Sequence, residues 1–195
     1  MPYVAPALRV ERRLVALLGR WLLIVLLLPA GGFAQENPNK VKAAFLRNFA
    51  HYVNWPDHAL AEDTTSWRIG ILGPDPFGDV LEAVFEGRTE QGRPFEVFRA
   101  DRPEQLPPCH IVFVAYGDAA RRRAGLAALK NKPVLTVGDG LEFLQDGGII
   151  GFQVADRVKM SVNLDQARAV ALTIQTKMLE VSADILENGV LRRMR

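Results

Sequence analysis

The feature that most constrains the fold is a run of five consecutive apolar residues, Ile111 to Ala115, which directly follows Cys109 and His110. A strand without a polar face has two dry surfaces, so it belongs in the interior of a sheet that is covered on both sides. Two prolines precede the run and cannot continue a helix, and Asp118 follows it in a position suited to capping the next helix. The run therefore predicts a central buried strand.

Two other segments have the same character, Arg68–Leu72 before the central strand and Pro133–Val137 after it. Helix-like segments separate the three, at Phe77–Phe85 and Asp118–Asn131. Strands that alternate with helices in this way are typical of parallel sheets. We predict an α/β fold, a single three-layer αβα domain with a mainly parallel sheet.

The spacing of apolar residues predicts the remaining elements. We expect an antiparallel hairpin, 149–154 with 158–162, at one edge of the sheet, and a final long helix that covers the sheet. In strand 94–100 we expect Arg99 to point outward. The other expected elements are a first helix at 39–53, the strand at 94–100, a short helix at 141–145, the final helix from 164 to about 187, and a frayed tail at 188–195.

The amino-terminal segment resembles an export signal. Its arginines precede an uninterrupted apolar run, Trp21–Leu28, and small residues at Gly32 and Ala34 suit a signal peptidase. We predict a signal peptide over residues 1–34, cleaved after Ala34, and a mature domain over 35–195. A retained anchor is the alternative, although the apolar run is shorter than the roughly 20 residues that a spanning helix needs.

Removing residues 1–34 takes away four arginines and one glutamate from a chain with 24 basic and 22 acidic residues, which changes the formal net charge from +2 to −1. The basic character of the whole chain therefore comes from the export signal. It is no argument for nucleic-acid binding, and we expect no nucleic-acid partner.

The mature chain shows no recognisable arrangement of catalytic or metal-ligating residues. Its one cysteine, Cys109, excludes an internal disulfide and begins a buried strand, which indicates a packing role. Cys109 and His110 point to opposite faces of a strand and cannot form a dyad, and the histidines lack zinc-ligand spacing. We therefore expect no enzymatic activity, no metal and no cofactor.

The turn Gly73–Gly78 lies where a strand leads into a helix, and open α/β sheets bind ligands at such edges. It lacks the glycine spacing of a phosphate-binding loop, so an aspartate-capped turn beside a shallow pocket is the preferred interpretation. The residues that we expect to bind a ligand or partner are Asn48, Trp55, Asp75, Pro76, Phe77, Gly78 and Asp139.

Six short motifs follow one another along almost the whole mature chain. They are Lys42–Phe49 with Trp55-Pro56, Leu72–Gly78, Cys109–Phe113, Leu135–Asp139, Gly147–Ile150 and Val162–Leu164.

Together these motifs resemble the YfiR-like family of exported bacterial proteins. The resemblance implies an α/β fold, a periplasmic location, frequent dimers and no known enzymatic activity. It also implies a repressor that restrains a membrane-bound diguanylate cyclase by contacting its periplasmic part, with relief by an outer-membrane lipoprotein. Cyclic-di-GMP output and biofilm formation would then fall. Some relatives have cysteines at positions that resemble Gly70, Leu144 and Gly151, in disulfides that include the counterpart of Cys109; those partners are missing here.

Two functions follow from these observations. The first is a periplasmic regulatory protein that binds the periplasmic part of an inner-membrane signalling protein. The alternative is a periplasmic small-molecule-binding sensor that uses a pocket near Trp55, the 75–78 turn and Asp139. For a homodimer, the candidate faces are the first helix, through Phe45, Phe49 and Tyr52, and the final helix; both could instead simply cover the sheet.

Overall fold

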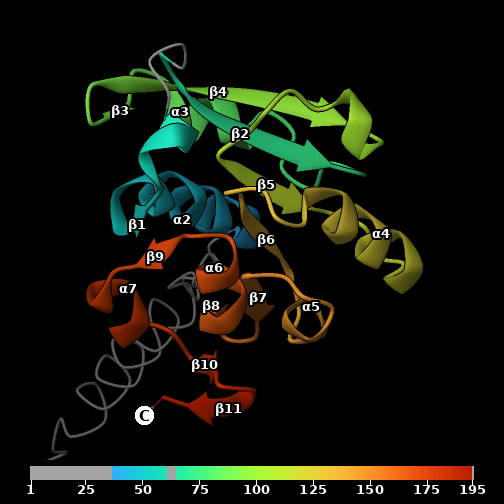
Figure 1. The fold of residues 1–195 in the computed structure, drawn as a ribbon. Helices are drawn as coiled ribbons and strands as arrows, with labels where there is room; N and C mark the ends of the chain where they lie inside the picture. Colours follow the sequence, from blue (N-terminus) through green and yellow to red (C-terminus); the bar gives the residue numbers. More distant parts are fainter. Residues whose placement is uncertain (1–36, 61–64, 195) are drawn as a thin grey trace, which may run out of the picture. The chain divides into compact units, whose positions relative to one another are not determined.

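Nine strands form one mixed sheet in the computed structural model, which describes residues 37–60 and 65–194 (Figure 1). The predicted signal peptide and its cleavage site lie outside these residues. The strands are β2 (Trp67–Leu72), β3 (Thr89–Glu90), β4 (Arg93–Ala100), β5 (Ile111–Val114), β6 (Leu135–Asp139), β7 (Ile150–Val154), β8 (Val158–Asn163), β10 (Asp184–Glu187) and β11 (Val190–Arg193).

Six α-helices of the described residues surround the sheet. They are α2 (Pro38–Tyr52), α3 (Val80–Phe85), α4 (Ala119–Leu129), α5 (Glu142–Gln145), α6 (Leu164–Ala169) and α7 (Thr176–Glu180). Two short 3-10 helices, Asp57–Leu60 and Pro103–Gln105, lie in connections. Strands β1 (Val53–Asn54) and β9 (Thr173–Ile174) pair with each other as a separate antiparallel ribbon.

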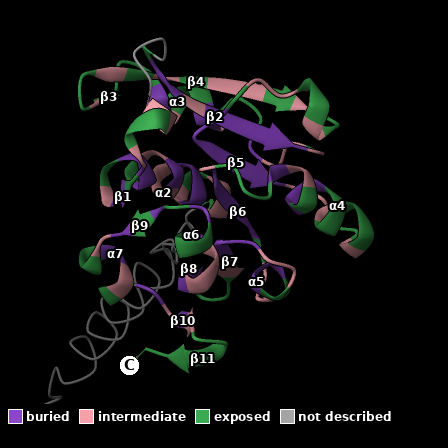
Figure 2. Cartoon of the chain, in the orientation of Figure 1, coloured by how far each residue is buried: buried purple, intermediate pink, exposed green. Residues whose placement is uncertain are grey.

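The sheet has the strand order β11-β10-β8-β7-β6-β5-β2-β4-β3. Strands β4, β2, β5, β6 and β7 run parallel, as do β8 and β10, whereas β7 and β8 pair antiparallel. Strand β5 lies in the middle of this order with all four of its residues buried (Figure 2). The prediction of a central strand with two dry faces is confirmed.

Alternate residues of β5 contribute to two separate cores. Ile111 and Phe113 pack in a core with α2, α3, α6 and α7, whereas Val112 and Val114 pack in a second core with α4 and α5. Helices therefore cover both faces of the sheet. The predicted three-layer αβα architecture is confirmed.

Helix α2 begins where the sequence predicts a start. Pro38 occupies its first turn, and the Asn37 side chain accepts a hydrogen bond from the backbone N–H of Asn39 at 3.0 Å. The rings of Phe45 and Phe49 lie 5.6 and 6.1 Å from that of Phe152 on β7. Helix α2 thus uses its aromatic face to cover the sheet, and Phe49, at 1% exposure, is not available to a dimer partner.

The predicted final helix, 164 to about 187, is wrong. The first turns form α6, but the chain leaves the helix at Ala171, which has a positive φ of 60°. It then forms β9, the short helix α7 and strand β10, which pairs parallel with β8. Pairing with distant strands prevails here over the local helical spacing of apolar residues.

The predicted hairpin exists as β7 and β8, but the prediction that it lies at the sheet edge is wrong. Strand β10 pairs with the outer side of β8, and β11 adds an edge strand beyond it. The frayed tail predicted for 188–195 is therefore also wrong over β11. Asn188 and Gly189, with φ of 52° and 71°, make the tight turn between β10 and β11.

Candidate functional site

A polar cluster lies at the carboxyl ends of the parallel strands. Strand β2 ends at Leu72, and the chain turns at Gly73, whose φ is 97°. A Cβ at this position would lie 2.7 Å from the ring of Tyr116, so both conformation and space require glycine. The loop that follows, Gly73–Gly78, leads to α3; we call it the β2–α3 loop.

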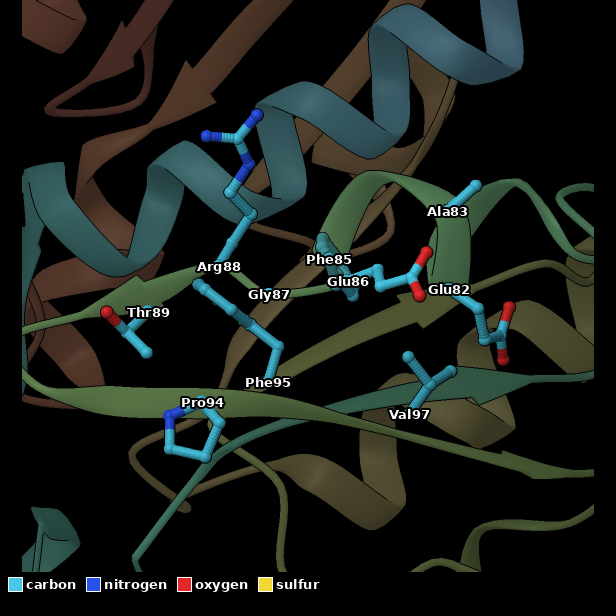
Figure 3. Close-up of a pocket in the computed structure, with 10 residues that line it drawn as sticks. All are labelled: Glu82, Ala83, Phe85, Glu86, Gly87, Arg88, Thr89, Pro94, Phe95 and Val97. Atoms are coloured by element: carbon cyan, nitrogen blue, oxygen red, sulfur yellow. The ribbon is translucent and has the colours of Figure 1, made fainter.

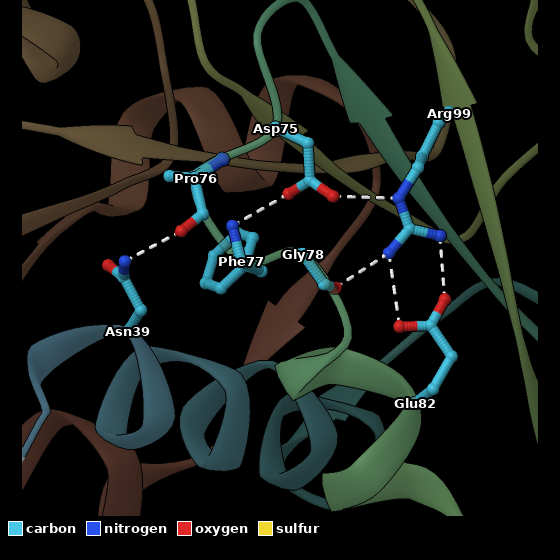
Figure 4. Close-up of polar contacts among 7 residues, drawn as sticks. All are labelled: Asn39, Asp75, Pro76, Phe77, Gly78, Glu82 and Arg99. Atoms are coloured by element: carbon cyan, nitrogen blue, oxygen red, sulfur yellow. Dashed lines mark hydrogen bonds and ion pairs between the residues drawn. The ribbon is translucent and has the colours of Figure 1, made fainter.

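Asp75 holds this loop in shape, as expected for an aspartate-capped turn. One carboxylate oxygen accepts a hydrogen bond from the backbone N–H of Phe77 at 2.8 Å. The other oxygen accepts from Nε of Arg99 on β4 at 2.7 Å (Figure 4). Arg99 therefore points into the loop, and the prediction that it points outward is wrong.

Arg99 connects the loop to helix α3. Its guanidinium donates to the carbonyl oxygen of Gly78 at 3.0 Å and to both carboxylate oxygens of Glu82 at 2.6 and 3.1 Å. The hydrogen bond from Arg99 holds the pKa of the Glu82 carboxyl below its ordinary value, and the pKa of Arg99 is raised, mainly by Glu82. Glu82 and Arg99 therefore stay charged near neutral pH, and their charge-assisted hydrogen bonds hold the loop against α3.

Two further contacts hold the loop against the core. Asn39 on α2 donates its side-chain N–H to the carbonyl oxygen of Pro76 at 2.6 Å. The ring of Phe77 lies edge-on to that of Phe113 with centroids 4.9 Å apart, and it is buried. The loop is thus preorganised, with Pro74 and Gly78 exposed at its surface.

Asp139 lies at the same edge, at the end of β6. Its carboxylate pairs with Nζ of Lys42 at 2.7 Å, where the lysine side chain is 7% exposed and the aspartate side chain 52%. A buried ammonium needs such a partner, so the ion pair with Asp139 offsets part of the cost of burying Lys42 in α2. A cavity of about 340 Å³ opens beside Asp139 and is also lined by Pro76 and Tyr116.

The structure thus brings five of the seven predicted residues to one edge and separates the other two. Asp75, Pro76, Phe77 and Gly78 share the β2–α3 loop, and Asp139 lies across the cavity from Pro76. Asn48 is exposed on α2, where its side chain accepts a hydrogen bond from Arg47.

Trp55 lies at the opposite end of the sheet. Its ring packs 5.1 Å from that of Trp67, at the start of β2, and 6.3 Å from that of His110, just before β5. Starts of parallel strands mark the amino edge, whereas the β2–α3 loop marks the carboxyl edge. Trp55 and the loop therefore cannot line one pocket.

Sequence reasoning missed the residues that hold the site together, namely Lys42, Arg99 and Asn39. Lys42 is an apparently polar position within the predicted helix, and nothing local indicates burial. For Arg99 a signal exists, because strand alternation places it on the same face as Phe95 and Val97, which pack on α3.

A shallow groove lies next to this network, between α3 and strands β3 and β4 (Figure 3). Its volume is about 780 Å³, and its floor is the stacked pair Phe85 and Phe95, with ring centroids 5.0 Å apart. Glu82 and Glu86 line one side. The groove runs from Glu82, which belongs to this network, to the start of β4 at the opposite end of the sheet.

The polar groups of the site are largely paired. The charged groups around the loop are paired with one another, and the Asp139 carboxylate is paired with Lys42. Within residues 37–60 and 65–194, no group of three or more His, Cys, Asp or Glu side chains is arranged to hold a metal ion.

A comparison with protein families matches residues 39–183 to the model described as YfiR/HmsC-like. The chain belongs to the YfiR/HmsC-like family. The predicted family resemblance is confirmed, and the match runs from the first turn of α2 to the residue before β10. A comparison with curated proteins finds no match.

Membership places this YfiR-like protein in a periplasmic, regulatory and non-catalytic family that acts in diguanylate cyclase signalling. Such a role involves interaction with the periplasmic domain of a membrane signalling protein. Among the helices of the described residues, none combines the length and the apolar character needed to cross a bilayer.

Proposed function

We propose that this YfiR-like protein binds the periplasmic domain of an inner-membrane diguanylate cyclase and restrains it, which lowers cyclic-di-GMP and biofilm formation. The observation that carries the proposal is the family match over residues 39–183, which covers both cores of the αβα domain. The prediction that the chain is exported through a signal peptide cleaved after Ala34 is part of this proposal.

The docking surface that we propose is the carboxyl edge, formed by the β2–α3 loop and Asp139. Its support is preorganisation, because a loop held by Asp75, Arg99 and Asn39 loses little conformational entropy when a partner binds. Exposed groups at this edge include Pro74, Gly78 and the half-exposed Asp139 carboxylate. Asn48 extends the proposed surface along α2.

The direct test is binding of the exported, purified protein to the periplasmic domain of the membrane signalling protein encoded beside its gene. Biolayer interferometry measures the affinity, and a cyclic-di-GMP reporter measures restraint in cells. We expect Pro74→Trp, which adds bulk to the exposed loop, to weaken binding at least about tenfold. Asp139→Asn should weaken it less, because the shape of the side chain is retained.

Glu96→Gln is the matched control, since it removes an exposed carboxylate from β4 outside the proposed surface. Equal binding by the wild type and this variant, together with loss in Pro74→Trp, supports the proposed surface. If the wild type fails to bind the neighbouring sensor domain and deletion of its gene leaves cyclic-di-GMP unchanged, the proposed function is wrong.

Relief of restraint by an outer-membrane lipoprotein and formation of a homodimer also belong to the proposal. Light scattering coupled to size-exclusion chromatography tests the dimer. Pull-down with the lipoprotein of the same gene neighbourhood tests capture. A monomer at micromolar concentration would remove the dimer from the proposal and leave the restraint itself standing.

A further inference from the structure

A second cavity lies at the amino edge of the sheet, at the opposite ends of the strands from the β2–α3 loop. It has a volume of about 550 Å³, within the range of about 300–1,000 Å³ that is usual for small-ligand pockets. The segments that lead into β2, β5 and β6 form its floor. The short 3-10 helices and the end of α4 form its sides.

The walls of this amino-edge cavity are largely apolar. Leu106, Val112, Leu129 and Val134 line it together with a group of prolines from the connections into β5 and β6. The thiol of Cys109 also faces it, and burial raises the pKa of that thiol to about 12. The thiol is therefore an uncharged apolar part of the wall near neutral pH.

The charged side chains of the amino-edge cavity all have one sign. Arg68 and Lys132 line it, and no described residue among its lining is acidic. Neither cation forms an ion pair with a described residue. The cavity therefore combines an apolar interior with two cations that no described residue pairs.

Several buried hydrogen-bond donors near this end of the sheet have no acceptor among the described residues. Three buried side-chain atoms lack a partner among the described residues, and all three are donors: Nε of Arg68, Nη1 of Arg93 and Nε1 of Trp55. Of the three residues only Arg68 lines the cavity. A buried donor without an acceptor is unfavourable, and a ligand that brings an acceptor oxygen to the Arg68 guanidinium relieves this cost.

His110 lines the cavity, and burial and the nearby positive charges both contribute to a lowered pKa of its imidazole. Desolvation, followed by the charges of Arg93 and Arg68, lowers the pKa of its imidazole to about 4, against the opposing effect of a backbone hydrogen bond with Ala59. Its Nδ1 accepts the backbone N–H of Arg68 at 3.0 Å. His110 is thus neutral near pH 7 and adds no positive charge of its own.

We infer that the amino-edge cavity binds a small carboxylate with an extended apolar body, of the fatty-acid class. The apolar part lies along Leu106, Val112 and Val134, and the carboxylate faces Arg68 and Lys132. Charge complementarity favours this class, because a carboxylate supplies the two cations with a counter-charge that the described residues do not, whereas a neutral or cationic amphiphile supplies none. This site is separate from the proposed docking surface, so either proposal can fail without the other.

The test uses three probes with the same ten-carbon chain and different head groups: decanoate, decan-1-ol and decyltrimethylammonium. Calorimetry gives the affinities. Trp55 and Trp67 are the only tryptophans after residue 34, and their rings lie 6.3 and 5.0 Å from that of His110, so their fluorescence reports occupancy. We expect decanoate to bind about tenfold or more tightly than decan-1-ol, and the cation most weakly.

Two charge variants locate the carboxylate. We expect Lys132→Gln to weaken decanoate binding about threefold and Arg68→Gln about tenfold, with decan-1-ol unaffected. Lys130→Gln is the matched control, because Lys130 is exposed two residues away and does not line the cavity. Val134→Phe fills the apolar part and should abolish binding of decanoate and decan-1-ol alike.

Three results would overturn the inference: no probe binds the folded wild type, all three bind equally, or Lys130→Gln weakens decanoate binding as much as Lys132→Gln. If Val134→Phe or Arg68→Gln does not fold, the comparison of Lys132→Gln with Lys130→Gln still decides, since both residues are exposed. Preferential decanoate binding that Lys132→Gln weakens, and that Lys130→Gln does not, supports it.

Discussion

Nε of Arg99 donates a hydrogen bond to the carboxylate of Asp75 at 2.7 Å, across 24 residues of sequence. This contact links an edge-proximal strand to the loop at the end of β2. The same guanidinium reaches Glu82 on α3, so one side chain joins a strand, a loop and a helix. The geometry of the carboxyl edge depends on Arg99.

The first prediction concerns this link. Arg99→Ala should lower the free energy of unfolding by about 1 kcal/mol, because its ion pairs are partly exposed and each is worth little alone. The larger effect should be local, with faster amide hydrogen exchange at Phe77, whose N–H bonds to Asp75. Hydrogen exchange with mass spectrometry measures it. Arg88→Ala, at an exposed arginine nearby, is the control and should change neither quantity.

The second prediction follows from buried His110. The folded-state pKa is about 4 against an ordinary value of 6.5, so between these values the unfolded chain binds a proton that the folded chain does not. The free energy of unfolding should therefore fall as the pH falls from about 6.5 to about 4, by at most about 1.4 kcal/mol per pH unit from this group. Urea unfolding across this range measures the slope.

His110→Asn tests the assignment, because the asparagine oxygen can replace Nδ1 as acceptor for Arg68 and does not titrate. The slope should become shallower in this variant. His58→Gln, at an exposed position, should leave it unchanged. An unchanged slope in His110→Asn would assign the acid sensitivity to other groups.

The centre of the fold could be predicted from sequence because its signals are local. The apolar run at β5 and the capping groups Asn37 and Asp118 report burial and helix starts directly. The region after Asn163 could not be predicted in the same way. Its apolar spacing suits a helix, whereas the observed strands depend on β1 and β8, which are distant in sequence. The Asn188-Gly189 turn was the one local sign of a hairpin there.

The candidate site likewise has one part that local sequence predicts and another that depends on contacts distant in sequence. The Asp75 turn is a contact between residues two positions apart, and its form follows from the sequence. Its partners Arg99 and Asn39 are set by tertiary packing. The expectation that Trp55 shares a pocket with this loop is wrong, because Trp55 packs on Trp67 at the start of β2 and the loop follows the end of that strand.

The third prediction uses the spacing between β2 and the segment before β5. A Cβ at Gly70 would lie 3.2 Å from Sγ of Cys109, a separation compatible with a disulfide. Gly70→Cys should therefore form a disulfide with Cys109 on export and raise the free energy of unfolding by about 2 kcal/mol. Loss of both free thiols in the unfolded protein measures formation. Gly70→Cys with Cys109→Ala is the control; two free thiols in the single variant would contradict the geometry.

The last prediction concerns Asp184, which fastens the carboxyl-terminal hairpin to the sheet. Asp184 is 4% exposed, and its carboxylate accepts hydrogen bonds from Ser161 Oγ at 2.9 Å and Gln153 Nε2 at 3.1 Å. Asp184→Ala leaves the buried Ser161 hydroxyl without its acceptor, whereas Gln153 Nε2 keeps its hydrogen bond to Ser161 Oγ at 2.7 Å, and the change should lower the free energy of unfolding by about 2 kcal/mol. Chemical denaturation measures it, and amides of β10 should exchange faster.

Asp184→Asn keeps one acceptor oxygen, so it should lose less stability than Asp184→Ala. Asp156→Ala, at a side chain that is 77% exposed, should be neutral and is the matched control. Strand β10 follows directly after the family-matched residues 39–183, yet it pairs with β8 inside the sheet. Wild-type stability in Asp184→Ala would mean that β10 and β11 are accessory, and that the sheet ends in effect at β8.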